Sequence, residues 1–137
     1  MAAQGDVGYS STLYGLAAAW YAEAGRFDEA RDCQAICRAT TPSGDVTSHA
    51  LWRVAGALIA AHDGDTETAT QLARESLTWL DSVKAPNEQA AQCRQAALAL
   101  AAVGDRAGAV ELVDEARRLY LVKGNTAMAA RCTLPSE

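Results

Sequence analysis

Aromatic residues, prolines and long apolar runs are scarce in this sequence of 137 residues. Aromatic side chains make up 6% of it, and there are three prolines. Half of the residues are apolar, mostly Ala and Leu, and this composition favours helix over sheet. No apolar run reaches the roughly 18 residues that a membrane-spanning helix requires. The sequence therefore predicts a single helical domain over residues 1–137, located in the cytoplasm and without a membrane partner.

A basic tract is also missing. The chain carries 12 Lys and Arg against 17 Asp and Glu, and the resulting net charge of −5 is spread along its length. Proteins that bind nucleic acids by neutralising phosphates need clustered cations. We therefore expect no nucleic-acid partner.

The sequence lacks the common signatures of catalysis and metal binding. It contains no phosphate-binding loop ending in Gly-Lys-Ser or Gly-Lys-Thr, no HExxH and no GxSxG. Cys33 and Cys37 would share one face of a helix, but no further Cys or His pair completes a zinc-like set of ligands. Buried cysteines of an apolar stripe are the simpler interpretation. We expect no enzyme activity, no cofactor, no metal and no disulfide framework.

One pattern occurs three times. Residues 22–30, 61–69 and 101–109 each read AxxGxxxxA, and successive glycines lie 39 and 40 residues apart (25 to 64, 64 to 104). A fixed period in this range is typical of proteins built from stacked helical repeats. The glycines and the alanines that close each pattern are Gly25 and Ala30, Gly64 and Ala69, and Gly104 and Ala109.

Apolar residues recur at helical spacing on both sides of each glycine. We expect each glycine to end one helix in a left-handed conformation, and Asp28, Asp65 and Asp105 to cap the next helix. Gly124 to Thr126 form a further stop-and-cap signal. The prediction is an all-α, right-handed solenoid of three antiparallel helix pairs. The expected pairs span 10–42, 47–83 and 87–123, with a short capping helix at 125–133 and a loose lead-in over residues 1–8.

The first unit resembles the tetratricopeptide repeat. Tyr14, Tyr21, Phe27, Ala30 and Pro42 match its consensus residue types, although the period here exceeds the usual value of about 34. The stretches ALWR at 50–53, LARE at 72–75 and LYLVKGN at 119–125 are similar to phrases of a particular repeat segment. That segment is the C-terminal part of actinobacterial regulators that join a nucleotide-cyclase or transcriptional-regulator module to a signalling ATPase. The resemblance implies a piece of a larger regulatory protein and brings no catalytic residue with it.

In such repeats the first helix of each pair lines a concave face where partners bind. The resemblance thus implies a mainly apolar set of candidate contact residues, comprising Leu16, Glu23, Leu51, Val54, Leu58, His62, Arg94, Gln95 and Leu98. An apolar groove suits a protein or peptide partner, such as a helix or a second copy of the chain. The alternative is that these residues pack against one another.

We therefore expect a non-catalytic module for protein–protein interaction, acting as a scaffold or sensing segment. The second hypothesis is a small-molecule effector pocket formed by Trp52, Arg94 and His62. Trp20 and Trp79 are expected in the core, because a tryptophan side chain buries a large apolar area.

Overall fold

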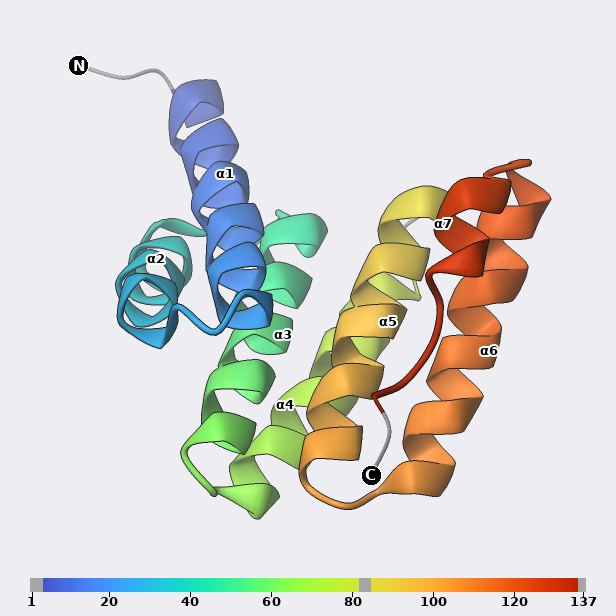
Figure 1. Ribbon diagram of the computed structural model, residues 1–137. Helices are drawn as coiled ribbons and strands as arrows, with labels where there is room; N and C mark the ends of the chain where they lie inside the picture. The colour runs from blue at the N-terminus through green and yellow to red at the C-terminus, as the bar shows by residue number, and fades with distance from the viewer. Residues whose placement is uncertain (1–3, 82–84, 136–137) are drawn as a thin grey trace.

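The computed structural model describes residues 4–81 and 85–135, and for residues 4–9 the backbone alone (Figure 1). These residues form helices without any strand, which confirms the all-α prediction. None of the helices in the described ranges is long and apolar enough to cross a bilayer. The helices are α1 (Gln4–Glu23), α2 (Phe27–Thr40), α3 (Val46–His62), α4 (Thr66–Leu80), α5 (Pro86–Ala102), α6 (Arg106–Val122) and α7 (Thr126–Ala130).

Each helix packs mainly against its neighbours in the chain. The most extensive contacts join α1 to α2, α3 to α4, and α5 to α6. A second set of contacts joins α1 to α3 and α3 to α5, so that α3 lies between α1 and α5 (Figure 1). The helices α2 and α4 each contact the helix that follows them, and α7 packs on α6. As a result, α1, α3 and α5 together form one face of the molecule.

The repeated pattern forms the turns that precede α2, α4 and α6. Gly25, Gly64 and Gly104 have φ values of 80°, 82° and 91°, in the left-handed region that favours glycine. The N–H of the residue after each glycine donates back across the turn, for example from Asp65 to the carbonyl of Ala60 at 2.9 Å. This bond is typical of a helix that ends in a Schellman turn. The prediction for these three glycines is confirmed.

A fourth turn of the same type precedes α7. Gly124 has a φ of 70°, and the N–H of Asn125 donates to the carbonyl of Tyr120 at 2.9 Å. In each of the four turns the residue after the glycine is the N-cap of the next helix. The pattern of the first three turns therefore extends to the C-terminal part of the chain.

The geometry of the turn decides which residue caps the next helix. Asp65 and Asp105 accept hydrogen bonds from backbone N–H groups in the first turns of α4 and α6, as predicted. The prediction for Asp28 is wrong, because Arg26 occupies the equivalent position and Asp28 lies one residue inside α2. In these three turns an aspartate caps the next helix only where it directly follows the turn glycine.

The closing alanines lie in the first turn of the second helix. Ala30, Ala69 and Ala109 are fully buried, and the N–H of each donates to the carbonyl of the cap residue four positions earlier at 3.0 Å. A larger side chain at any of these positions would have to displace the facing helix. These alanines and the turn glycines are therefore structural residues.

Two expected boundaries differ from the structure by more than two residues. Helix α1 begins at Gln4, so residues 4–8 of the expected lead-in are helical, whereas residues 1–3 lie outside the described ranges. The expected capping helix at 125–133 is shorter, because α7 ends at Ala130. Residues 131–135 then run back along the molecule (Figure 1), where Arg117 donates to the carbonyl of Cys132 at 2.6 Å. The expected end of the second pair, at residue 83, also falls outside the described ranges.

The core is built from small and medium side chains, with Leu51, Val54 and Leu100 among the fully buried ones. Trp79 is half-buried, and its ring stacks on that of His49 with 4.3 Å between centroids. The prediction that Trp20 is a core residue is wrong, since 77% of its surface is exposed. Trp20 lies on a side of α1 that no described helix covers.

Candidate functional site

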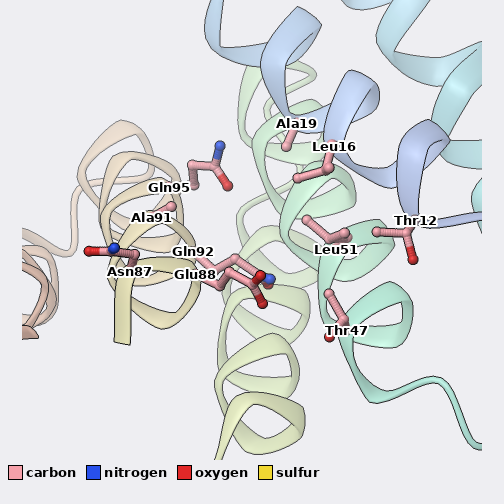
Figure 2. A pocket seen from close by; sticks show the side chains of 10 residues that line it. All are labelled: Thr12, Leu16, Ala19, Thr47, Leu51, Asn87, Glu88, Ala91, Gln92 and Gln95. Atoms are coloured by element: carbon pink, nitrogen blue, oxygen red, sulfur yellow. The ribbon is translucent and has the colours of Figure 1, made fainter. Parts of the chain in front are cut away.

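A groove of about 240 Å³ opens between α1 and α5, with α3 at its base (Figure 2). It lies on the face where α1, α3 and α5 follow one another. Side chains of all three helices line it, namely Thr12, Leu16, Ala19, Thr47, Leu51, Asn87, Glu88, Ala91, Gln92 and Gln95.

The groove has an apolar interior and a polar margin. Leu16 and Ala19 form the α1 side, Ala91 forms part of the α5 side, and Leu51 lies at the base with only 2% of its surface exposed. Leu16 is 52% exposed, although it is next to the core. Covering a large aliphatic side chain in that position with a partner is energetically favourable, because apolar surface is removed from water.

An ion pair between Glu23 and Arg94 connects α1 to α5. Their side chains are 21% and 18% exposed, respectively, and the Nε of Arg94 has no hydrogen-bond partner among the described residues. Glu23 lies one turn beyond Ala19, and Arg94 is next to Gln95. The pair therefore links the two sides of the groove at one of its ends.

The structure separates the predicted contact residues into distinct environments. Leu16, Leu51 and Gln95 line the groove, and Glu23 and Arg94 pair at its end. The remaining four lie elsewhere: Val54 and Leu58 are buried in the core, Leu98 packs against the core, and His62 is exposed and stacks on Phe27 with 3.7 Å between ring centroids.

Seven lining residues were not among the nine predicted contact residues: Thr12, Ala19, Thr47, Asn87, Glu88, Ala91 and Gln92. Helical periodicity identifies a helix face, but it does not show how far the neighbouring helix lies from each position on that face. The residues three and four positions away from Gln92 include Glu88, Gln89 and Gln95, so the sequence pattern gave no signal that Gln92 is buried.

The residues of the hypothetical effector pocket do not come together. Trp52 and His62 are ten residues apart on α3, which corresponds to about 15 Å along the helix axis. Trp52 is covered by the guanidinium groups of Arg38 and Arg53, at 4.9 and 4.1 Å from its ring centroid. Arg94 pairs with Glu23. Each of the three residues thus has its own separate contacts.

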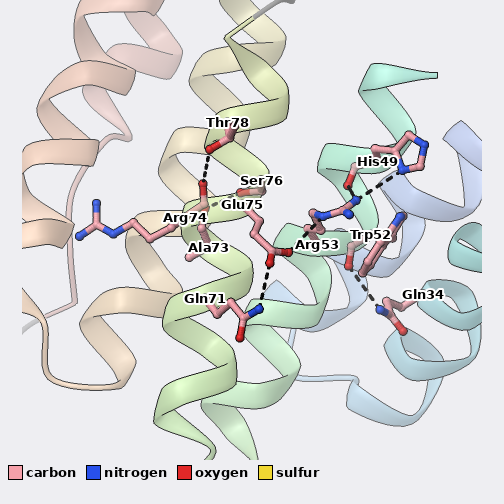
Figure 3. A network of polar contacts seen from close by, with 10 residues as sticks. All are labelled: Gln34, His49, Trp52, Arg53, Gln71, Ala73, Arg74, Glu75, Ser76 and Thr78. Carbon is pink, nitrogen blue, oxygen red and sulfur yellow. Dashed lines mark hydrogen bonds and ion pairs between the residues drawn. The ribbon is translucent and has the colours of Figure 1, made fainter. Parts of the chain in front are cut away.

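A second polar cluster connects α3 to its neighbours on both sides (Figure 3). The Arg53 guanidinium lies between the rings of Trp52 and Trp79, donates to the carbonyl of His49 at 3.0 Å and pairs with Glu75 at 3.3 Å. From α2, Gln34 donates to the carbonyl of Trp52 at 3.4 Å. The Gln34 contact joins α2 to α3, and the Arg53 contacts join α3 to α4.

The four cysteines are free thiols, and burial raises the pKa of each. For Cys93 the pKa rises to about 11. The thiolate is the form that attacks electrophiles and binds metals, so these side chains are poor nucleophiles and ligands near neutral pH. Within residues 10–81 and 85–135, no three His, Cys, Asp or Glu side chains gather into a group that could hold a metal ion.

Comparisons of this chain with protein-family models, with curated proteins and with solved structures find no match. The functional argument therefore depends on the residues and the geometry described above.

Proposed function

We propose that the chain is a right-handed α-solenoid of three antiparallel helix pairs, similar to tetratricopeptide repeats, and that it binds a segment of another protein. The groove between α1, α3 and α5 is the binding surface, and the module has no catalytic role. By the sequence resemblance, it acts as a scaffold or sensing segment of a cytoplasmic bacterial regulator.

The order of helix contacts supports the solenoid. In a stack of helix pairs, each pair packs mainly against its neighbours. Here α3 contacts both α1 and α2, and α5 contacts both α3 and α4, as stacked pairs require. The recurring glycine turn, with the same hydrogen bonds each time, supports a repeated unit.

The observation that carries the functional proposal is the exposed apolar surface of α1. Leu16 borders the groove, while Trp20 and Leu13 are 77% and 48% exposed. At about 100° per residue, these three side chains lie within roughly 60° of one another around the helix. The groove and this surface therefore form one continuous apolar area, as expected for a protein interface.

The extent of this area favours a protein segment over a small molecule. Pockets for drug-sized ligands enclose about 300–1,000 Å³ and surround most of the ligand. The groove measures about 240 Å³, and a small ligand inside it would leave Trp20 and Leu13 uncovered. An amphipathic helix could place one or two side chains in the groove and cover the outer residues as well.

The proposal can be tested with a displayed library of helix-forming peptides of about 15 residues, selected on the wild-type chain. We expect Leu16→Asp to lower the affinity of the selected peptides for the chain about ten-fold or more, because the substitution introduces a charge into the contact area. Leu121→Asp on α6 is the matched control, since Leu121 is 51% exposed and Leu16 52%. Fluorescence anisotropy would give the dissociation constants.

Both variants should retain the wild-type melting temperature, so that a loss of binding reports on the surface. The proposal fails if no peptide binds saturably. It also fails if the two substitutions weaken binding equally.

A further inference from the structure

Gln92 introduces a buried polar group into the apolar groove. Its side chain is 3% exposed, and its Oε1 atom has no hydrogen-bond partner among the described residues. The side chain lines the groove and extends from α5 towards Thr47 on α3 (Figure 2). A buried acceptor without a partner carries a desolvation penalty, which a ligand that brings a donor would relieve.

Glu88 adds a negative charge to the same part of the groove. It lies four residues before Gln92, so the two side chains share one face of α5 (Figure 2). Glu88 is exposed and forms no ion pair with any residue that the structure describes. Neither Lys nor Arg is among the lining residues. The groove thus offers an apolar surface, a buried acceptor and a carboxylate that forms no ion pair among the described residues, although Lys123 lines a neighbouring pocket with Glu88.

We propose that the occupant is a basic amphipathic segment of another protein, and this rests on the proposed function. One of its apolar side chains packs between Leu16, Leu51 and Ala91. A neighbouring Lys or Arg donates an N–H to Oε1 of Gln92 and pairs with the Glu88 carboxylate.

The chemistry of these two side chains suits both requirements. Lys and Arg have apolar stems that can lie along Leu51 while their charged ends reach polar groups. Each carries several donors, so one side chain can bond to both acceptors. A second copy of this chain fits the groove less well, because each copy has a net charge of −5 and like-charged molecules repel.

The test uses the peptides selected on the wild-type chain that depend on Leu16. In each peptide, every Lys and Arg is replaced in turn by Met, which keeps the apolar stem, and by Glu. We expect one position at which Met weakens binding about ten-fold and Glu weakens it more. The wild-type peptide should also bind less tightly as the salt concentration rises.

Variants of the protein locate the contact. Gln92→Leu and Glu88→Gln should each lower the affinity for the unsubstituted peptide several-fold. The peptide with Met at the basic position should bind the Gln92→Leu variant as tightly as it binds the wild-type chain. Gln95→Leu is the matched control, because Gln95 lines the same groove but is less buried than Gln92. It should leave the preference for the basic peptide unchanged.

The possible failures can be told apart. If the peptides depend on Leu16 but tolerate Met at every basic position, the basic partner is wrong and the proposed function stands. If binding does not depend on Leu16, the proposed function itself fails. A dimer in sedimentation equilibrium that Leu16→Asp abolishes would identify a second copy as the occupant and overturn the inference. Hexylamine provides the last comparison. If it raises the melting temperature saturably, if Gln92→Leu abolishes that shift, and if no peptide binds, then the occupant of the groove is a small amine and the inference is overturned.

Discussion

The N-terminal and C-terminal parts of the described helical structure are covered to different extents. At the C-terminal end, α7 and residues 131–135 pack on the molecule, so that Ala129 and Cys132 are 5% and 0% exposed. At the N-terminal end, Leu16 and Trp20 of α1 are 52% and 77% exposed. The C-terminal end is therefore partly covered by its own chain, although Leu121 and Val122 of α6 remain 51% and 64% exposed, whereas no described segment covers Leu16 and Trp20 of α1.

The turns do not account for this difference. The turn at Gly25 and the turn at Gly124 make the same cross-turn bond, from Arg26 to Tyr21 at 2.8 Å and from Asn125 to Tyr120 at 2.9 Å. The residues that face outwards from the helices differ instead. On α6 the ion pair of Asp114 and Arg117, at 2.9 Å, lies between the exposed Val110 and Leu121, whereas residues 13–20 of α1 include no charged side chain. The turn geometry is thus shared along the chain, whereas the exposed apolar surface differs from one helix face to another.

Removing the C-terminal cover should have the largest effect on stability. A chain ending at Asn125 loses the buried contacts of Met128, Ala129, Cys132 and Leu134. We expect the free energy of unfolding to fall by about 3–5 kcal/mol, because the loss exposes apolar area on both α7 and α6. Urea denaturation followed by circular dichroism would measure it. A loss below about 1 kcal/mol would mean that the two ends are energetically alike.

The ion pair between Glu23 of α1 and Arg94 of α5 should contribute less to stability than the C-terminal cover. Glu23→Gln or Arg94→Met leaves the other charge of the pair without a partner, although its side chain is about four-fifths buried. Each substitution should therefore lower the free energy of unfolding by about 1–3 kcal/mol. The double variant should cost less than the two single changes together, since neither charge then remains. Additive losses in urea denaturation would show that the pair does not couple the two helices.

The smallest effect is expected at the turns, and it should be equal at both ends. Gly25→Ala and Gly124→Ala each place a side chain on a backbone with a φ of 80° or 70°, and the added Cβ would meet no atom within 4 Å. We expect a loss of about 1 kcal/mol at each site from backbone strain alone. Gly44→Ala is the control, because its surroundings are equally open and its φ is not positive. Clearly unequal losses at Gly25 and Gly124 would show that the turns are not equivalent.

The local features of the fold could be predicted from the sequence. The left-handed glycines, the helices around them and the caps Asp65 and Asp105 depend on residues within one turn of each other. Asp28 was misassigned because the cap is fixed by distance from the glycine, and in the first turn that position is occupied by Arg26.

The features that depend on distant parts of the chain could be predicted only in part. Trp20 has a large apolar side chain of the kind expected in a core, but its exposure depends on whether another helix covers that side of α1. Leu16, Leu51 and Gln95 were implied by the resemblance, which places the first helix of each pair on a concave face, whereas Gln92 was not. Its burial depends on how α5 sits against α1 and α3, and the Glu23–Arg94 pair that joins α1 to α5 is between residues 71 positions apart.

The most direct test of the binding surface is to map it by NMR. Amide chemical shifts of the ¹⁵N-labelled chain would be followed during titration with a selected peptide that contains a basic residue. We predict that the largest shifts occur at Leu16, Ala19, Leu51, Ala91 and Gln92, with little change at Leu121 and Val122 of α6. If the shifts centre on α6, or spread evenly over both ends of the stack, the groove between α1, α3 and α5 is not the binding site.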